Sequence, residues 1–250
     1  MSSFLITGAS RGFGLTLARE LVSLSPSIVG KVFATARGNS RALNEFARAN
    51  PDRVVVLKLD VTDERSIQRA AEDVEDYLDG RGLDVLVNNA GVCQFADGIR
   101  SMDNLQDSFI VNVLGVHWVT RAFLPLLQRG NLKKVANIST ALASMTLASD
   151  AQFLLAPAYK TSKAAMNALT VQYALEYEKE GFSFMALCPG WMKTELGGGD
   201  MADLTTEQSA KAVLDIIFTP GQKHNGQKPK VFVEGWENRS QCYDGTYVPW

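Results

Sequence analysis

The sequence contains few cysteines and histidines, and this scarcity excludes several kinds of chemistry. Its 250 residues include 3 cysteines and 2 histidines. Cys93, Cys188 and Cys242 are widely spaced and odd in number, so we expect free thiols in a reducing compartment rather than a disulfide framework. Transition-metal sites draw mainly on these two residue types, and we therefore predict no metal site.

Long apolar runs and blocks of like charge are also missing. No stretch approaches the roughly 20 apolar residues that span a bilayer, and the first residues lack the basic and apolar regions of a signal peptide. The formal net charge is only −2, with no basic block for a polyanion. We therefore expect a cytoplasmic protein that binds neither membrane nor nucleic acid. A hydrophobic content of 46% still provides a sizeable core and excludes a disordered chain.

What the chain does contain is an alternation of short apolar runs with longer helical patterns, which is typical of a parallel α/β sheet. No linker or repeat divides it, so we predict one doubly wound α/β domain over residues 1–250. Seven parallel strands are predicted, at 4–7, 32–35, 54–59, 85–88, 135–138, 182–187 and 230–233. The clearest helical patterns lie at 14–24, 64–78 and 159–180. Long or glycine-rich connections at about 141–158 and 191–208 are candidate substrate loops.

A glycine-rich segment follows the first predicted strand and opens the first predicted helix. It reads Thr-Gly-Ala-Ser-Arg-Gly-Phe-Gly over residues 7–14. Glycines permit a tight turn and let backbone N–H groups approach a pyrophosphate at the positive end of the helix dipole. A plain glycine-rich turn has the same composition, but the strand–turn–helix setting favours a dinucleotide-binding Rossmann domain. The candidate cofactor residues here are Gly8, Ser10, Arg11, Gly12, Phe13 and Gly14.

The end of the second predicted strand indicates which dinucleotide is bound. An acidic residue there would hydrogen-bond the free 2′-hydroxyl of NAD(H), but the chain has Arg37, and Arg11 lies within the glycine loop. Two guanidinium groups suit a 2′-phosphate because their planar, forked donors pair with phosphate oxygens. We predict NADP(H) as the cofactor. The alternative is that both arginines are solvated surface residues.

A tyrosine and a lysine begin the longest helical pattern. Tyr159 and Lys163 are four residues apart and thus share one face of a helix. A free tyrosine has a pKa near 10, and a neighbouring ammonium lowers that pKa by stabilising the phenolate. The pair is therefore a candidate acid/base. The same pattern alone also fits an amphipathic helix whose lysine reaches to solvent.

Taken together, six motifs in order resemble the short-chain dehydrogenase/reductase family. They are the glycine loop, Asn-Asn-Ala-Gly at 88–91, Asn112 in Val-Asn-Val-Leu-Gly, Asn-Ile-Ser-Thr at 137–140, the Tyr159–Lys163 pair, and Pro-Gly-Trp-Met-Lys-Thr at 189–194. The resemblance covers essentially the whole chain. The segment from 189 onward, the helix start at 204–209 and the Tyr243-Asp244-Gly245…Pro249-Trp250 ending are similar to a carbonyl-reductase-like branch. That branch contains C-factor and sniffer proteins and fungal norsolorinic-acid-type ketoreductases.

The resemblance implies a role for each matched residue. Tyr159 would be the general acid in reduction, Lys163 would bind the nicotinamide ribose and lower the tyrosine pKa, and Asn112 would hold a water in a proton relay. Asp60 and Val61 would lie at the adenine. The other implied cofactor contacts are Asn89, Ala90 and Gly91 beside the ribose, Met192 and Thr194 near the carboxamide, and the adjoining Pro189 and Gly190.

The hydroxyl group that would polarise the substrate carbonyl has two candidates. In the family pattern the second hydroxyl residue is the catalytic one, and this register falls on Thr140 rather than Ser139. Neighbouring strand residues point to opposite faces of a sheet, so only one of the two can face the site. We favour Thr140, whose hydroxyl can donate the same hydrogen bond as a serine, and keep Ser139 as the alternative.

The segment 141–158 makes the spacing from this hydroxyl to Tyr159 longer than is usual in the family. It carries the apolar residues Leu142, Met145, Leu147, Phe153, Leu154 and Leu155. Two interpretations stay open. The segment is a pocket wall for a bulky, aromatic or polyketide-type carbonyl, or it buries these residues against its own domain or a subunit partner.

These patterns predict an NADPH-dependent reductase that converts a ketone or aldehyde to an alcohol by hydride transfer, with Tyr159 as general acid. One alternative is an NADP(H)-binding regulatory or signalling protein with little turnover. Another is an NAD-dependent alcohol dehydrogenase. The resemblance further implies a homo-oligomer, a dimer or tetramer, whose other partner is a small-molecule carbonyl or alcohol substrate.

Overall fold

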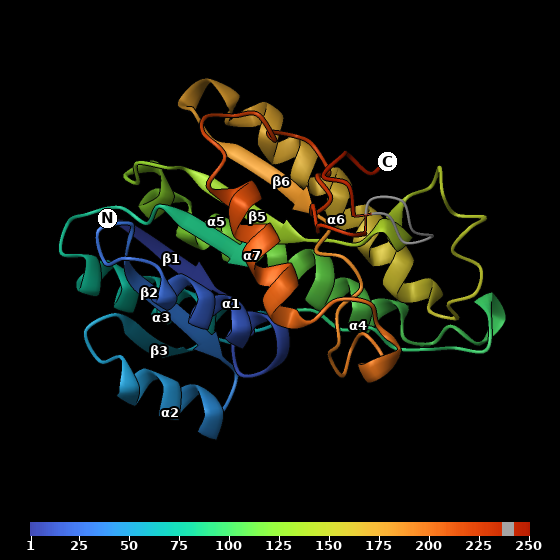
Figure 1. Cartoon of the computed structure of the whole chain (residues 1–250), viewed down its shortest axis with the longest axis horizontal. Coiled ribbons are helices and arrows are strands. Elements are labelled where there is room, and N and C mark those ends of the chain that lie inside the picture. The colour runs from blue at the N-terminus through green and yellow to red at the C-terminus, as the bar shows by residue number, and fades with distance from the viewer. Residues whose placement is uncertain (237–242) are drawn as a thin grey trace.

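The computed structural model describes residues 1–236 and 243–250, which form a parallel sheet between two layers of helices (Figure 1). The strands are β1 (Ser2–Ile6), β2 (Val29–Ala36), β3 (Val54–Lys58), β4 (Val85–Asn88), β5 (Lys134–Ile138) and β6 (Ser183–Leu187). Their order across the sheet is β3-β2-β1-β4-β5-β6, and neighbouring strands pair in parallel. This is a doubly wound arrangement of the Rossmann type, as predicted.

The helices cover both faces of the sheet (Figure 1). They are α1 (Gly12–Ser23), α2 (Arg41–Ala49), α3 (Glu64–Leu78), α4 (Leu105–Phe109), α5 (Gly115–Gln128), α6 (Pro157–Glu176) and α7 (Thr206–Ile217). One hydrophobic core lies between the sheet and α1, α2 and α7, and the other lies under α3, α5 and α6. Successive residues of β1 serve the two cores in turn, with Phe4 and Ile6 in the first and Leu5 in the second.

The structure has six strands, and the prediction of a seventh at 230–233 is wrong. This segment runs beside β6 but contacts it only through isolated bridges, such as the one between Cys188 and Lys230. The N–H of Cys188 donates to the carbonyl of Pro229 at 2.9 Å. Because Pro229 has no N–H of its own, the ladder is interrupted there. The chain then pairs with a later segment, where Lys230 N donates to Thr246 O at 2.9 Å.

Helix α4, a π-helical turn η2 (Ile110–Leu114) and α5 form one continuous helix from Leu105 to Gln128. Within residues 1–236 and 243–250 it is the one helix whose length and apolar composition would suit a membrane span. Its inner face, however, is part of the second core, where Val119, Phe123 and Leu127 are fully buried. The apolar composition is thus explained by packing against the sheet.

Candidate active site

The loop between β1 and α1 leaves almost no room for side chains. Gly8 and Gly12 have φ angles of +67° and +55°, in the left-handed region that favours glycine. A Cβ atom on Gly14 would lie 2.5 Å from Asn89 Nδ2 and 2.6 Å from Gly8 O. One on Gly8 would lie 3.0 Å from Ala90 Cα. The glycines therefore let the Asn-Asn-Ala-Gly segment after β4 pack directly on this loop.

Hydrogen bonds from Thr7 and Asn89 fasten the two segments together. Asn89 Nδ2 donates to Thr7 O at 2.8 Å and to Gly8 O at 3.1 Å. The backbone N–H groups of Asn89 and Ala90 each donate to Thr7 Oγ1 at 3.0 Å. These bonds join the ends of β1 and β4, between which the strand order of the sheet reverses. Ligands of doubly wound sheets bind at this point.

The start of α1 suits an anion. Arg11, at the N-cap, has an extended backbone and makes no side-chain capping bond. The Phe13 side chain is buried in the core, so only its backbone borders the loop. A cradle with three glycines at a helix N-terminus matches the backbone approach and the partial positive charge that a pyrophosphate needs. A Cβ on Gly12 would lie 3.7 Å from Thr194 Cγ2, so the 191–208 loop borders the same cradle.

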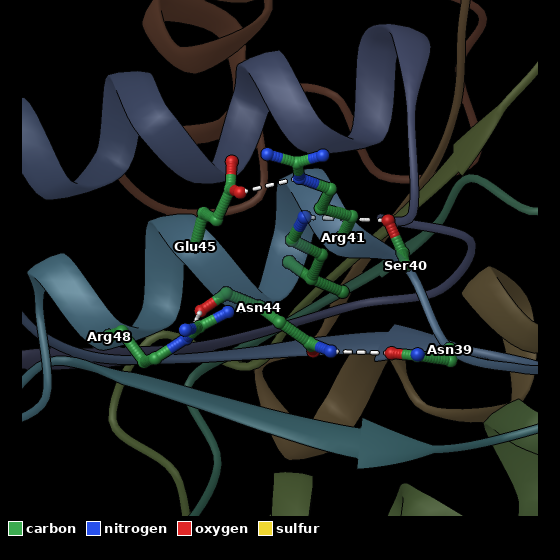
Figure 2. A network of polar contacts seen from close by, with 7 residues as sticks. Asn39, Ser40, Arg41, Asn44, Glu45 and Arg48 are labelled. Atoms are coloured by element: carbon green, nitrogen blue, oxygen red, sulfur yellow. Dashed lines mark hydrogen bonds and ion pairs between the residues drawn. The ribbon is translucent and has the colours of Figure 1, made fainter.

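Arg37 follows β2 and is exposed. An open groove of about 310 Å³ beside it is lined by residues from the ends of β2 and β3 and from α2. Figure 2 shows the polar network at the start of α2, where the Asn44 side chain donates to Asn39 and Ser40 caps the helix. Ser40 Oγ also donates to Ser10 O at 2.7 Å, which ties the glycine loop to α2.

Three exposed arginines belong to these segments. Arg11 pairs with Glu195 at 3.2 Å, and Arg41, the first residue of α2, pairs with Glu45 at 2.7 Å. Exposed ion pairs of this kind are weak, so both guanidinium groups can exchange their carboxylate for a phosphate at little cost. Arg41 was not among the predicted residues. Its position directly after a serine N-cap, four residues from Arg37, is the signal that could have found it.

Asp60 and Val61, the residues expected at the adenine, form a rigid turn between β3 and α3. Asp60 Oδ1 accepts from the backbone N and the Oγ1 of Thr62 at 2.9 and 2.8 Å. Asp60 N donates to Ser66 Oγ at 3.0 Å. Val61 is buried against Gly115, where a Cβ would come within 3.0 Å of it. Both residues thus lie at the carboxyl end of the sheet, on the same edge as the glycine loop.

The two hydroxyl candidates after β5 point in different directions. Ser139 is buried, and its Oγ donates to Asn167 Oδ1 on α6 at 2.6 Å. The Thr140 side chain lies close enough to the Tyr159 phenol to lower the phenol pKa, and its Oγ1 accepts from Leu142 N at 3.2 Å. The structure therefore brings Thr140, and not Ser139, to the tyrosine at the start of α6.

Burial determines the protonation of Tyr159. Only 8% of the residue is exposed, and desolvation raises the pKa of its phenol well above the usual value. The Cys93 thiol also raises this pKa, whereas the hydrogen bond with Thr140 lowers it. The sequence-based expectation that Lys163 lowers the tyrosine pKa is not what this structure shows. Desolvation outweighs the other effects, and the lysine is engaged elsewhere.

Lys163 lies one helical turn further along α6 and is also buried. Its Nζ donates to Ile138 O, at the end of β5, at 2.6 Å. Desolvation lowers the pKa of Lys163 to about 8, and the Cys93 thiol raises it. A lysine with this pKa is mostly charged at neutral pH. The ammonium therefore supplies positive charge at the carboxyl end of the sheet.

Asn112 is fully buried in the π turn η2 and links three segments. Its Nδ2 donates to Val92 O at 2.9 Å and to Ser162 Oγ at 3.0 Å, and its Oδ1 accepts from Val92 N at 3.0 Å. Ser162 Oγ in turn donates to Tyr159 O at 2.9 Å. Ser162 was not among the predicted site residues. Its sequence position between Tyr159 and Lys163 does not indicate that it joins Asn112 to Tyr159.

Gly91 stands between Asn112 and Lys163. A Cβ on it would lie 3.2 Å from Asn112 Oδ1 and 3.6 Å from Lys163 Nζ. The Asn-Asn-Ala-Gly segment thus contacts the glycine loop at one end and these two side chains at the other. Five of the six sequence motifs consequently meet at the carboxyl ends of β1, β4 and β5.

The sixth motif, residues 189–194, follows β6. Pro189 O accepts from Ser209 Oγ of α7 at 2.7 Å, and Gly190 has a φ angle of +82°. Met192 is partly buried and forms an isolated parallel bridge with Leu204. These contacts bring the motif back toward α1, where Thr194 reaches the glycine loop.

Two of the three cysteines lie near this site. Cys93 is half-buried, Cys188 is buried, both are free thiols, and Cys242 lies outside the described residues. Desolvation raises the pKa of Cys93 to about 11, so its thiol is neutral at physiological pH. Among residues 1–236 and 243–250, no group of three or more histidine, cysteine, aspartate or glutamate side chains is placed to hold a metal ion.

Comparisons with known proteins identify the family. The short chain dehydrogenase family model matches residues 3–205. The short chain dehydrogenase virK of Hypocrea virens is 32% identical over 260 residues, covering 96% of this chain and 93% of the relative. The crystal structure of NADPH-bound carbonyl reductase from chicken fatty liver superposes with a TM-score of 0.86 at 30% identity, covering 100% of this chain and 98% of the other. Carbonyl reductase Sniffer of D. melanogaster gives 0.86 at 28% identity, with both chains covered completely. The chain therefore belongs to the short-chain dehydrogenase/reductase family of nicotinamide-dependent oxidoreductases, in its carbonyl-reductase-like branch.

Proposed function

We propose that the protein is an NADPH-dependent reductase of ketones or aldehydes. The observation that carries this proposal is the contact between Thr140 and Tyr159, inside the network that holds Asn112 and Lys163. It places a hydroxyl donor and a protonated phenol together, and carbonyl reduction needs both a polarising group and a proton donor. When bound, NADPH supplies the hydride that adds to the carbonyl carbon.

The side chains divide the remaining work. The Thr140 hydroxyl donates a hydrogen bond to the substrate carbonyl oxygen, and Tyr159 gives its phenolic proton to that oxygen as negative charge develops. Because burial raises the pKa of Tyr159, the phenol keeps its proton at neutral pH until the reaction takes it. We assign the Lys163 ammonium, which donates to Ile138 O at 2.6 Å, to the nicotinamide ribose.

Asn112 acts on the same tyrosine through Ser162. Its side-chain Nδ2 donates to Ser162 Oγ, which donates to the backbone carbonyl of Tyr159. The side-chain oxygen of Asn112 has a second lone pair, which can accept a hydrogen bond from the water of a proton relay. The relay would return a proton to the phenolate after each turnover.

The cofactor residues follow from the cradle at α1. We assign the pyrophosphate to the glycine loop, Gly8 to Gly14, and the 2′-phosphate to Arg37 with Arg11. Asp60 and Val61 border the adenine, and the Asn89–Gly91 backbone borders the ribose. Pro189, Gly190, Met192 and Thr194 close the nicotinamide end. The close packing of Gly14 against Asn89, which leaves space only for backbone, supports this assignment.

Exposed apolar side chains on three loops support a bulky substrate. The loops follow β4, β5 and β6 at the sheet end where Tyr159 lies, and Ala96 N donates to Leu155 O at 3.0 Å between the first two. The exposed residues are Phe95, Ile99, Met145, Phe153, Leu155, Trp191, Leu196 and Met201. Apolar groups exposed in this way mark a binding surface. We propose that they form the wall of the substrate site and prefer this to a subunit contact, because all three loops emerge beside Tyr159.

The test is turnover of NADPH with a panel of aromatic and quinone carbonyls, followed by absorbance. Replacing Tyr159 with Phe removes the proton donor, and we expect a loss on the order of 10²-fold or more in kcat. Tyr173→Phe is a matched control, because it removes another partly buried tyrosine hydroxyl, which contacts His117 Nδ1 at 2.9 Å far from Thr140. Equal rates for wild type and Tyr159→Phe would refute the mechanism.

The same assay separates the alternatives. Tight NADPH binding without turnover of any carbonyl would favour a regulatory protein, and alcohol oxidation with NAD would favour a dehydrogenase. A cytoplasmic location and a homo-oligomer built through α5 and α6 also belong to the proposal. Leu175 on α6, 65% exposed, offers an apolar contact for a second copy, and sedimentation of the purified protein would test it.

A further inference from the structure

The segment 243–250 pairs with residues 228–233, which run beside β6, through the isolated bridges Pro229–Tyr247 and Phe232–Asp244. Val248 N donates to Lys228 O at 2.9 Å, and Gly245 N donates to Val231 O at 3.2 Å. An ion pair of 2.9 Å joins Lys230 Nζ to Asp244 Oδ1, with 18% and 31% of these side chains exposed. We refer to residues 243–250 as the strap.

One end of the strap holds the 191–208 loop. Tyr243 is 3% exposed, and its hydroxyl donates to Asp203 Oδ2 at 2.6 Å. The hydroxyl oxygen of Tyr243 also accepts from Trp191 N at 3.2 Å. A Cβ on Gly190 would lie 3.2 Å from the Tyr243 ring. A single phenol therefore ties the first residue of the loop to a residue near its far end.

The other end of the strap holds the 141–158 loop. The carbonyl oxygen of Trp250 accepts from Thr146 N at 3.1 Å, Thr146 Oγ1 at 2.7 Å and Ser144 Oγ at 3.3 Å. The ammonium of Lys228, a residue only 1% exposed, lies 5.9 Å from the centroid of the Trp250 ring. Lys228 Nζ also donates to Pro249 O at 3.4 Å. Lys228 thus contacts the Trp250 ring and Pro249 O, while the carbonyl oxygen of Trp250 binds the 141–158 loop.

We propose that the strap sets the relative position of the two substrate loops, and that Tyr243 and Trp250 are positioning residues that determine which carbonyls fit. The loop held by Trp250 begins directly after Thr140, and the loop held by Tyr243 carries Met192 and Thr194. Both contacts therefore lie a few residues from groups that we assign to substrate and cofactor. This inference rests on the proposed reductase activity and adds the residues, outside the reacting groups, that select substrate size.

The mechanical reason lies in how few bonds join each loop to the strap. The 144–146 turn reaches the strap through one carbonyl oxygen, and Trp191 reaches it through one phenol. Removing the Thr146 hydroxyl leaves the cofactor site untouched, because the 144–146 turn carries no residue that we assign to the cofactor. Loosening of this turn should therefore appear in the binding of large substrates and not in the binding of NADPH.

The kinetic test uses Tyr243→Phe and Thr146→Val, each of which removes one hydroxyl and preserves the shape of the side chain. We expect KM for a bulky aromatic ketone to rise about tenfold, which corresponds to the loss of one or two hydrogen bonds. For a small aliphatic aldehyde KM should change less than about twofold, and in Thr146→Val kcat and the Kd of NADPH should stay near wild type. Thr219→Val is the control, since it removes a threonine hydroxyl that donates to Asp215 O outside the loops.

A second measurement is independent of turnover. Hydrogen exchange of the Thr146 amide, which donates to Trp250 O, should become several-fold faster in Tyr243→Phe although the two residues hold different loops. Unchanged exchange at Thr146, or equal KM changes for small and large substrates, would overturn the strap proposal while leaving the reductase intact. Failure of the proposed reductase mechanism would instead appear as equal turnover in wild type and Tyr159→Phe, whatever the hydrogen-exchange rate of the Thr146 amide.

Discussion

The cofactor side and the substrate side of this molecule are positioned by different means. At α1, the Gly14 backbone packs against the Asn89 side chain and Gly8 O, and an added Cβ on Gly14 would lie 2.5 Å from Asn89 Nδ2. Beyond β5 and β6, long loops are held by a few hydroxyl groups, such as the bond of 2.7 Å between Thr146 and Trp250. The first arrangement tolerates no extra atom, whereas the second can shift when one oxygen is removed. The two sides should therefore respond differently to mutation.

The largest effect is expected at Thr140, where the substrate side meets the chemistry. Thr140→Val removes the hydroxyl that contacts Tyr159, and we expect kcat to fall on the order of 10²–10³-fold, as for other lost oxyanion donors. NADPH affinity should be unchanged. Steady-state kinetics with an aromatic ketone, together with fluorescence titration of NADPH, would measure both.

Two companion variants sharpen this result. Thr140→Ser keeps a hydroxyl and should recover most of the activity. Ser139→Ala removes the bond to Asn167 Oδ1 and should cost only about 1 kcal/mol in the free energy of unfolding, with kcat largely kept. If Ser139→Ala proved the more damaging to kcat, the assignment of the catalytic hydroxyl would have to be exchanged.

On the cofactor side, a substitution at Gly14 should reduce both stability and NADPH binding. Gly14→Ala forces a Cβ against Asn89 and Gly8, and we expect destabilisation of about 1–3 kcal/mol together with a loss of NADPH binding of at least about tenfold. Gly38→Ala is the matched control, since a Cβ there meets nothing within 4 Å. Chemical denaturation and NADPH titration would compare the pair. Similar behaviour of the two variants would contradict the tight-packing account.

A smaller effect is expected at Arg37. Arg37→Asp should lower the affinity for NADPH about 10- to 100-fold relative to NADH, because charge-assisted bonds to the 2′-phosphate are replaced by repulsion. Arg69→Asp on α3, which changes the net charge equally, should leave the ratio of the two affinities near wild type. A ratio unaffected by Arg37→Asp would return this arginine to the solvated surface and reopen the NAD alternative.

The smallest effect concerns Lys228 beneath the strap. Desolvation lowers the pKa of this lysine in the folded chain to about 8, so the folded chain releases its proton before the unfolded chain does. The cost of burying the ammonium is therefore complete below about pH 8 and declines between about pH 8 and 10. Relative to Lys228→Met, the wild type should gain about 1 kcal/mol of stability between pH about 7 and about 8.7. Urea unfolding at both values would detect it, and a difference independent of pH would contradict it.

Local patterns made most of the cofactor side predictable. Gly8, Gly12 and Gly14 follow a strand and open a helix; Gly8 and Gly14 are required by contacts within that unit or with the segment after β4, and Gly12 by its φ angle of +55°. Alternation along a strand also indicated that only one of Thr140 and Ser139 faces the site, and the family register favoured Thr140. These inferences depend on neighbours in sequence or on repeating geometry, which a single chain displays directly.

The rest depended on contacts between distant residues. The apolar pattern at 230–233 predicted a strand, but the missing N–H of Pro229 limits its pairing with β6. No local pattern indicates that Trp250 binds Thr146, which is 104 residues away in the sequence. The pKa of Tyr159 was expected to fall, and it rises because the depth of its burial is a property of the folded chain.

The π turn at Ile110–Leu114 makes chain length as important as residue identity. A π turn holds one residue more than an α-helical turn, and each residue advances a helix by about 100°. Deleting Ile110, the one residue of the turn outside the Val-Asn-Val-Leu-Gly motif, would let the whole 105–128 helix run as a regular α-helix, with α4 rotated by that angle relative to α5. Asn112 would then leave Val92 although every motif kept its letters. A variant of this chain that is one residue shorter at this point should therefore lose the alignment of Tyr159, a change that comparison of side chains alone would overlook.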